Sequence, residues 1–141
     1  MRILFDTNIL LDAILRREPF TADAAFLIRA VGADQIKGFV SATTLTDIYY
    51  VVRRQTKSVE MAMNAVTDIL DIMEVCTVDR HVLEQAILSN QSDFEDAVQI
   101  ACAIAFGLDA IVTRDVAGFT DSAIQVLSPD VLRNQVEDPQ S

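Results

Sequence analysis

The sequence is poor in the side chains that zinc sites and disulfides require. Its 141 residues include two cysteines, one histidine and no tryptophan. Cys76 and Cys102 lie in apolar surroundings without ligand-like spacing, so we expect small buried side chains rather than a disulfide or a metal pair. His81 is expected to be exposed in the first turn of a helix. With one imidazole and two scattered thiols, the composition argues against a structural zinc site.

Glycine and proline are also scarce, with four and three residues, and no repetitive or charge-rich tract appears. Because 51% of the residues are apolar, a chain of this length can bury a substantial core. We expect one domain over residues 1–136 and a flexible acidic tail over residues 137–141. No apolar run approaches the ~20 residues that cross a bilayer, and Asp6 interrupts the first run too early for a signal peptide. The expected location is therefore the cytoplasm.

Positive charge is the remaining deficit. Lys and Arg total 11 residues against 21 Asp and Glu residues, for a formal net charge of -10. This balance argues against the broad basic surface typical of nucleic-acid-binding proteins. A small nucleic-acid site stays compatible with it, because bound cations or local arginines can offset the charge. The acidity also favours a basic protein partner.

What is present is an alternation of short apolar runs with longer segments of helical periodicity. The expected strands are residues 3–5, 38–41, 74–78, 110–113 and 124–127. The expected helices begin near Asn8, Thr21, Thr43 or Thr44, Ser58, Asp79, Ser92 and Ser128. This alternation predicts an α/β fold of three layers, α/β/α, in which helices cover both faces of a mainly parallel sheet.

Four aspartates lie at the ends of these strands or one turn inside the helices. Asp6 and Asp115 follow strands, whereas Asp47 and Asp96 lie past helix caps. An aspartate at a helix start is usually a cap or a charge that complements the helix dipole. That explanation serves for Asp12, Asp23, Asp79, Asp93 and Asp130. The other four could meet at the edge of the sheet where α/β proteins bind ligands.

Clustered carboxylates repel one another unless a cation lies between them or some of them stay protonated. Mg²⁺ or Mn²⁺, bound through one or two carboxylates and several waters, suits such a site better than an enclosed calcium cage. Charged clusters indicate function only probabilistically, so the residues alone leave a metal site and a structural cluster both open.

Segments of the chain resemble, in order, the motifs of the PIN domain family. They are Phe5–Asn8, Ser41–Asp47 followed by Tyr49 and Tyr50, Asp93–Ala97, and Thr113–Asp115 followed by Phe119. The order and separations are similar over nearly the whole chain. The resemblance is closest to compact bacterial PIN proteins, many of which are the toxins of toxin–antitoxin pairs. It implies metal-dependent cleavage of RNA, an antitoxin partner and a homodimer.

The resemblance also implies roles for individual residues. The catalytic acids and ligands of Mg²⁺ or Mn²⁺ would be Asp6, Asp47, Asp96 and Asp115, with Thr7, Asn8 and Thr113 as supporting residues. The family often has Glu at the second acid, so the shorter Asp47 is expected to reach the cation through water.

Asp93 is an alternative to Asp96 as the third acid, since residues three apart share a helix face. We favour Asp96, because it aligns with the family's acid before alanine. In addition, a capping box between Ser92 and Glu95 would leave Asp93 close to solvent.

A single histidine excludes RNA cleavage by paired imidazoles. The resemblance instead implies attack by water on a bound cation, which yields 5′-phosphate and 3′-hydroxyl ends. Arg53, Arg54 and Arg114 are candidates for binding RNA, although Arg114 could pair with one of the acids instead. Tyr49 and Tyr50 could stack on a base, or pack into the core or a dimer interface.

Two alternatives remain open. A PIN-like domain without activity could serve only as a binding module, against which the complete set of four acids argues. A haloacid-dehalogenase-like phosphatase also places Asp after its first strand. Its chemistry uses Asp-x-Asp, whereas this chain has Asp6-Thr7-Asn8, and its two lysines, Lys37 and Lys57, are not well placed.

Overall fold

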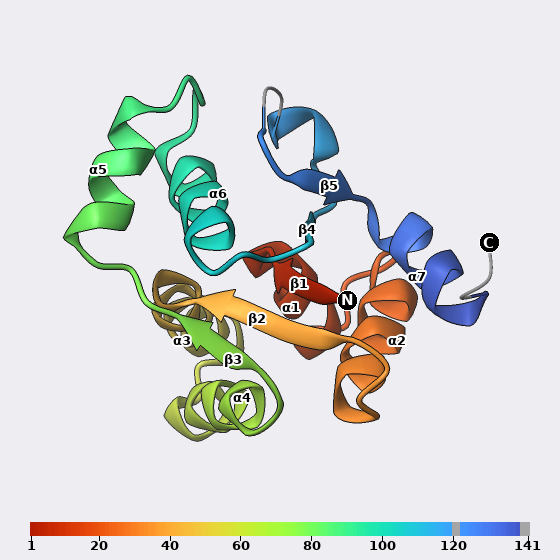
Figure 1. The fold of residues 1–141 in the computed structure, drawn as a ribbon. Helices are drawn as coiled ribbons and strands as arrows, with labels where there is room; N and C mark the ends of the chain where they lie inside the picture. The colour runs from red at the N-terminus through yellow and green to blue at the C-terminus, as the bar shows by residue number, and fades with distance from the viewer. Residues whose placement is uncertain (120–121, 139–141) are drawn as a thin grey trace.

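The computed structural model describes residues 1–119 and 122–138 and contains one sheet of five parallel strands (Figure 1). The strands are β1 (Arg2–Phe5), β2 (Lys37–Ser41), β3 (Glu74–Cys76), β4 (Ala110–Val112) and β5 (Gln125–Leu127). Their order across the sheet is β3-β2-β1-β4-β5. The sheet is therefore entirely parallel where the sequence predicted a mainly parallel one, and the predicted α/β class is confirmed.

Helices connect the strands and cover the sheet. They are α1 (Thr7–Ile14), α2 (Thr21–Gly32), α3 (Ala42–Thr56), α4 (Val59–Ile72), α5 (Arg80–Leu88), α6 (Phe94–Ala105) and α7 (Pro129–Glu137). A short 3-10 helix, η1 (Val116–Phe119), follows β4.

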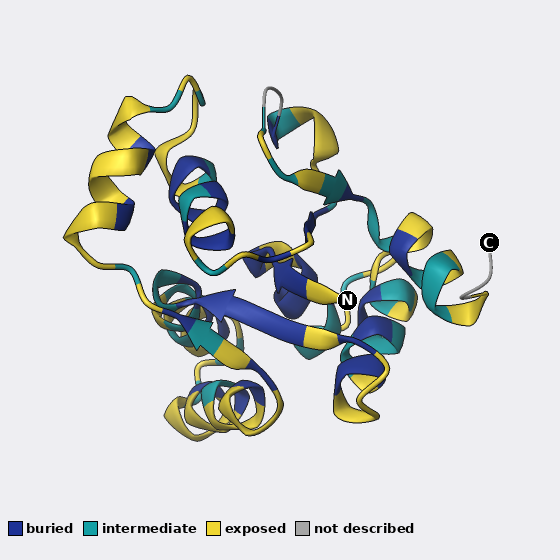
Figure 2. Cartoon of the chain, viewed as in Figure 1, coloured by how far each residue is buried: buried dark blue, intermediate teal, exposed yellow. Residues whose placement is uncertain are grey.

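The two faces of the sheet contribute to two separate apolar clusters. Figure 2 shows that β2 is buried along all but its first residue. Successive side chains of β1 point to opposite faces, so Ile3 and Phe5 join one cluster and Leu4 joins the other. The first cluster includes buried residues of α1 to α4 and α7, and the second includes those of α5 and α6. Burial on both faces explains why the central strands read as continuous apolar runs. The predicted three-layer arrangement is confirmed.

The strand order places a switch point beside β1. The chain passes from β1 to β2 and β3 on one side of it, and then crosses to β4 and β5 on the other side. In open parallel sheets, the crevice outside the carboxyl ends of the strands at such a point is the usual ligand site. Asp6 follows β1 there, and its backbone N–H donates to the Val112 carbonyl at the end of β4 at 3.1 Å.

Several helix starts differ from the prediction. The cap of α3 is Ser41, not Thr43 or Thr44, because the Ser41 Oγ accepts the Thr44 N–H at 3.3 Å. Helix α1 starts at Thr7, one residue before the predicted Asn8. The capping box between Ser92 and Glu95 is wrong: Asp93 is the cap of α6, and its Oδ1 accepts the Asp96 N–H at 3.0 Å.

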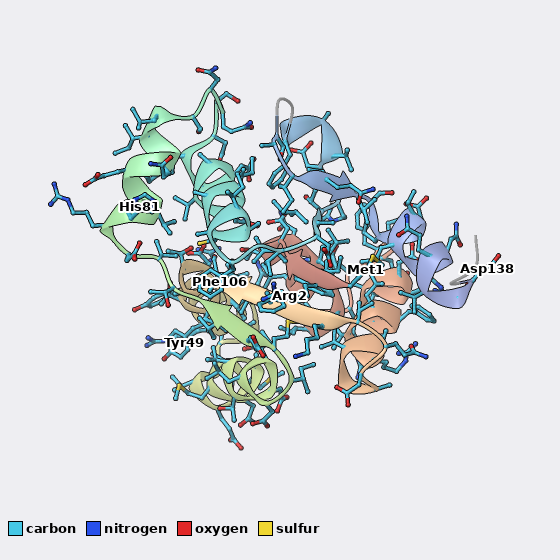
Figure 3. All side chains as sticks on the ribbon, viewed as in Figure 1. Met1, Arg2, Tyr49, His81, Phe106 and Asp138 are labelled. Atoms are coloured by element: carbon cyan, nitrogen blue, oxygen red, sulfur yellow. The ribbon has the colours of Figure 1, made fainter. Side chains whose placement is uncertain are left out.

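Other expectations are confirmed at the level of single residues. Cys76 and Cys102 are free and buried, and His81 is exposed on α5 (Figure 3).

Of the predicted tail, residues 137–141, Glu137 is the last residue of α7, and residues 139–141 lie outside the described part. Within residues 1–119 and 122–138, no helix is long and apolar enough to span a membrane.

Candidate active site

A pocket of about 520 Å³ opens at the carboxyl ends of β1 and β4. Its wall contains the four aspartates that the sequence singled out, together with two more acids, and these six are Asp6, Asp47, Asp93, Glu95, Asp96 and Asp115. They come from the ends of two strands, from α3 and from the first turn of α6. The fold thus brings together carboxylates that are far apart in the sequence. We call this site the acidic pocket.

Asp6 is the most firmly held of these acids. Its side chain is 7% exposed, and each of its carboxylate oxygens accepts one hydrogen bond. Thr113 Oγ1 donates to Oδ2 at 2.7 Å, and Gln99 Nε2 donates to Oδ1 at 3.0 Å. The Thr113 hydroxyl also accepts the Asp115 N–H at 3.1 Å. Thr113 therefore links Asp6 to the backbone of Asp115.

Asp115 lies in the turn between β4 and η1. Its Oδ1 accepts the Gly118 N–H at 3.1 Å, which fixes the carboxylate over the start of η1. A Cβ atom added at Gly118 would overlap this carboxylate. Glycine at position 118 is therefore required for Asp115 to lie where it does.

Asp47 is carried by α3, whose start is tied to α1 by buried hydroxyl groups. Thr44 Oγ1 lies 3.0 Å from Ser41 Oγ and 3.0 Å from Thr7 Oγ1. Thr7 thus contacts α3, the element that carries Asp47, rather than the Asp6 carboxylate that it was expected to support. Asn8 is exposed and lines the acidic pocket.

Asp93, Glu95 and Asp96 all line the pocket from the start of α6. Asp93 caps the helix, so capping and a position in the pocket are not alternatives for this residue. Glu95 makes a side-chain hydrogen bond with Asp47. Two carboxyl groups can share such a bond only when one of them holds a proton.

The electrostatics of the pocket reflect this crowding. Partial burial raises the pKa of Glu95 to about 7, helped by its bond to Asp47 and by the charges of Asp47, Asp6 and Asp93. The pKa of Asp96 is raised to about 6 by partial burial and then by the charges of Asp93, Asp6 and Asp115. Both shifts have the direction expected for like charges without a counter-ion.

The donor set fits a hard divalent cation. The pocket offers carboxylate oxygens and neither thiol nor imidazole groups, which is the preference of Mg²⁺ and Mn²⁺. In the described part of the chain, no three His, Cys, Asp or Glu side chains are grouped closely enough to hold an ion by themselves. Mg²⁺ usually keeps several waters and needs only one or two carboxylates. The pocket therefore fits a partly hydrated ion.

Of the three arginines that were candidates for binding RNA, only one lines the pocket. Arg54 lines the pocket, whereas the exposed Arg53 is not in its wall. Arg114 does not line the pocket either. It pairs with Asp12, with its Nε 2.7 Å from Asp12 Oδ2 and its Nη2 donating to Oδ1 at 3.2 Å.

Asp12 is fully buried in the second turn of α1, and Arg17 also approaches it at 3.9 Å. The interpretation of Asp12 as a cap or a dipole-complementing charge at a helix start is therefore wrong. The pKa of its carboxyl group is raised by burial, and the Arg114 charge opposes this shift.

The sequence did not single out Glu95, which lines the pocket, or Gln99, which contacts Asp6 from behind the pocket wall. Glu95 was expected to form a capping box with Ser92 and was therefore not proposed as an acid of the site. Gln99 was hidden in a helix rich in alanine and isoleucine. A polar residue three positions after Asp96, among buried apolar neighbours, was the available signal.

These features define a class of protein: a parallel α/β domain with an acidic pocket at the switch point of its sheet. The sequence matches the PIN domain family over residues 2–117, and the chain belongs to this family. The assignment argues against a haloacid-dehalogenase-like phosphatase. A search of curated proteins gave no match.

Solved structures with a similar fold include components of toxin–antitoxin systems. VapBC2 from Rickettsia felis, bound to a DNA fragment from its promoter, has a TM-score of 0.62 and 17% identity, over 91% of this chain and 98% of that one. A toxin–antitoxin complex from Klebsiella pneumoniae has a TM-score of 0.67 and 22% identity, over 90% and 97%. VapC20 from Mycobacterium tuberculosis, a sarcin-ricin loop cleaving toxin, has a TM-score of 0.62 and 18% identity, over 77% and 86%.

Proposed function

We propose that this protein is a ribonuclease that depends on Mg²⁺ or Mn²⁺ and acts as the toxin of a toxin–antitoxin pair. The observation that carries the proposal is the convergence of six carboxylates on one pocket at the switch point of the sheet. Membership of the PIN domain family and the similarity to a loop-cleaving toxin support it.

In this proposal Asp6, Asp96 and Asp115 would surround a partly hydrated cation, each reaching it directly or through one of its waters, and Asp47 would act through water. When bound, such a cation would lower the pKa of a coordinated water and offset negative charge on the phosphoryl oxygens. Thr113 orients Asp6 and fixes the backbone of Asp115. Asp93 fixes the first turn of α6 and thereby the position of Asp96.

The RNA would enter over α3. Arg54 lines the pocket one turn after Tyr50, which is 62% exposed and lines it as well. A guanidinium group binds phosphate, and an exposed aromatic ring stacks on bases without sequence preference. These contacts suit a single-stranded or looped RNA, whose bases are open to stacking.

An antitoxin and a second copy of the chain complete the proposal. One of the similar structures is a toxin–antitoxin complex, and the net charge of -10 favours a basic inhibitor. Such a pair would act in the cytoplasm. A small open reading frame beside the gene would supply a candidate antitoxin for co-purification.

A nuclease assay tests the central claim. Purified protein should cleave labelled single-stranded RNA with Mg²⁺ or Mn²⁺, and EDTA should abolish cleavage. Asp6→Asn should reduce the rate on the order of 100-fold or more, because it removes a charge that stabilises the transition state through the cation. The melting temperature of Asp6→Asn in EDTA should equal or exceed that of the wild type, since repulsion within the pocket is relieved.

The products decide between mechanisms. Hydrolysis by water leaves 5′-phosphate and 3′-hydroxyl ends, so 2′,3′-cyclic phosphate products would contradict the proposal. Complete inactivity with both metals and varied RNAs would instead favour a PIN domain that serves as a binding module.

A further inference from the structure

A buried glutamine reaches the acidic pocket from α6. Gln99 is 1% exposed, and its Nε2 donates to Asp6 Oδ1 at 3.0 Å. Its Oε1 is buried and has no hydrogen-bond partner in the described residues. The flanking Val98 and Ile100 are buried and apolar. A leucine or methionine would fill this place without burying an unpartnered oxygen, so packing alone does not account for glutamine here.

The chemistry of the contact sets the orientation of the amide. A carboxylate only accepts hydrogen bonds, so the Nε2 group of Gln99 faces Asp6 and the Oε1 group faces away. Thr113 supplies the second donor, to the other oxygen of Asp6. An ionised carboxylate has about four acceptor positions, so two donors leave Asp6 with free lone pairs for a cation.

The Gln99 amide that donates to Asp6 carries no charge, and this matters for the binding of a cation. A lysine or arginine in place of Gln99 would also bind Asp6, but its positive charge would repel a divalent cation at short range. A glutamate would repel Asp6. An amide stabilises the negative charge of Asp6 without cancelling it, so the charge can still attract a cation.

Gln99 also relates two of the acids to each other. It lies three positions after Asp96 on α6, and residues at this spacing share a helix face. Its bond to Asp6 joins residues 93 positions apart in the sequence. One side chain thereby couples the helix that carries Asp96 to the strand end that carries Asp6.

We propose that Gln99 is a positioning residue of the acidic pocket. Its neutral amide holds Asp6 in the orientation that binds the cation and keeps α6 in the register that brings Asp96 to the same ion. The inference rests on the proposed function in one respect only, namely that the pocket binds a divalent cation.

Direct Mn²⁺ binding to the full-length protein tests this inference without reference to catalysis. Titration followed by calorimetry and by electron paramagnetic resonance is carried out on the wild type, Gln99→Met, Asp6→Asn and Gln85→Met. Methionine retains the length of glutamine without the donor, and Gln85 is an exposed glutamine on α5, outside the pocket. Melting in EDTA reports whether each variant folds.

We expect Gln99→Met to melt in EDTA near the wild-type temperature, because the loss of a buried unpartnered oxygen offsets the loss of one of the two donors to Asp6. Its dissociation constant for Mn²⁺ should rise at least ~10-fold, as is typical when a group that orients a metal ligand is lost. The Mn²⁺ concentration for half-maximal RNA cleavage should rise in parallel, while the KM for RNA should stay unchanged. Gln85→Met should match the wild type throughout.

The outcomes are distinguishable. If the wild type binds Mn²⁺ and Gln99→Met binds it equally well, the inference about Gln99 is overturned and the proposed function stands. If the wild type binds no Mn²⁺, both are overturned.

If Gln99→Met does not fold, the inference is tested on the wild-type protein by recording the NMR signals of its glutamine side-chain amides. The Gln99 amide should be protected from exchange and should shift on addition of Mg²⁺, and this shift should be absent in Asp6→Asn. A freely exchanging Gln99 amide, or one indifferent to Mg²⁺, would overturn the inference.

Discussion

Glu95 and Asp96 are neighbours in the sequence, and both have carboxyl groups that bind protons more tightly in the fold than in the unfolded chain. Their pKa values are about 7 and about 6, against ordinary values of 4.5 and 3.8. A group whose pKa is raised by folding stabilises the fold when it is protonated, and this contribution is lost as the pH rises through the folded pKa. Glu95 and Asp96 therefore give the metal-free protein a sensitivity to pH that ordinary surface carboxylates lack.

In EDTA, the free energy of unfolding should fall between pH 5 and pH 8, as Glu95 and Asp96 lose their protons. Glu95→Gln should flatten the fall, because the amide stays neutral and can still bond to Asp47. Saturating Mg²⁺ at pH 8 should restore stability to the wild type. Urea denaturation measures each case, and an equal fall in wild type and Glu95→Gln would contradict the assignment to Glu95.

At the scale of elements, the pair formed by Arg114 and Asp12 fastens the turn after β4 to α1. Arg114 directly precedes Asp115, and Asp12 lies on the helix that follows Asp6. The guanidinium also lies over the Phe20 ring at 4.0 Å. Asp12 is fully buried, so its charge depends on this partner. The pair thus fixes two segments that carry pocket acids without contributing to the pocket wall itself.

Arg114→Met should reduce the free energy of unfolding by about 3 kcal/mol, because it leaves a buried carboxylate with only the more distant Arg17, at 3.9 Å, as a partner. Arg133 offers a matched control: it lies over Phe26 and pairs with Asp23 at 3.2 Å and with Glu137 at 3.0 Å, but these partners are 37% and 48% exposed. Arg133→Met should have a much smaller effect. Urea denaturation compares the two, and equal losses would show that the burial of Asp12 is unimportant.

The turn that holds Asp115 gives a prediction of its own. Gly118→Ala should displace the Asp115 carboxylate, since the new methyl group overlaps it, and should weaken Mn²⁺ binding roughly 10-fold or more. Gly32→Ala is the control, because nothing lies within 4 Å of a Cβ at that position. Calorimetric titration with Mn²⁺ checks both variants. Wild-type affinity in Gly118→Ala would show that the position of Asp115 is not important for the cation.

At the scale of the whole molecule, many apolar side chains remain on the surface. The exposed fractions of Ile87 and Leu88 on α5 are 69% and 76%, and that of Ile104 on α6 is 54%. Leu88 and Ile104 line one groove between α5 and α6, and contiguous exposed apolar groups are typical of surfaces that bind another protein. They support the proposed homodimer, since a second copy could cover them.

We expect light scattering at micromolar concentration to give twice the mass of the 15.6 kDa chain. Ile87→Lys with Leu88→Lys should shift the protein toward the monomer if this surface is the interface, because charge is disfavoured at an interface core. Met61→Lys, an exposed position on α4, serves as the control. A wild-type protein that remains monomeric would contradict the dimer.

The sequence by itself determined the layers of this fold and the four aspartates of the pocket. Central parallel strands are buried on both faces, so Ile3–Phe5 and Ala110–Val112 are unbroken apolar runs in the sequence. Because parallel strands end at one edge, a polar residue directly after each run is brought to the same place. Asp6 and Asp115 were predictable for this reason.

Only the tertiary structure decided the contacts between distant residues. Asp12 is buried with Arg114, 102 residues away, as its partner, and Gln99 contacts Asp6 because the fold brings α6 to the end of β1. At the start of α6, Ser92 and Asp93 are both good caps, and the path of the chain into the pocket selected Asp93 and freed Glu95 to face Asp47. Local propensity acts over a few residues, whereas burial and pairing depend on which surfaces meet when the chain is packed.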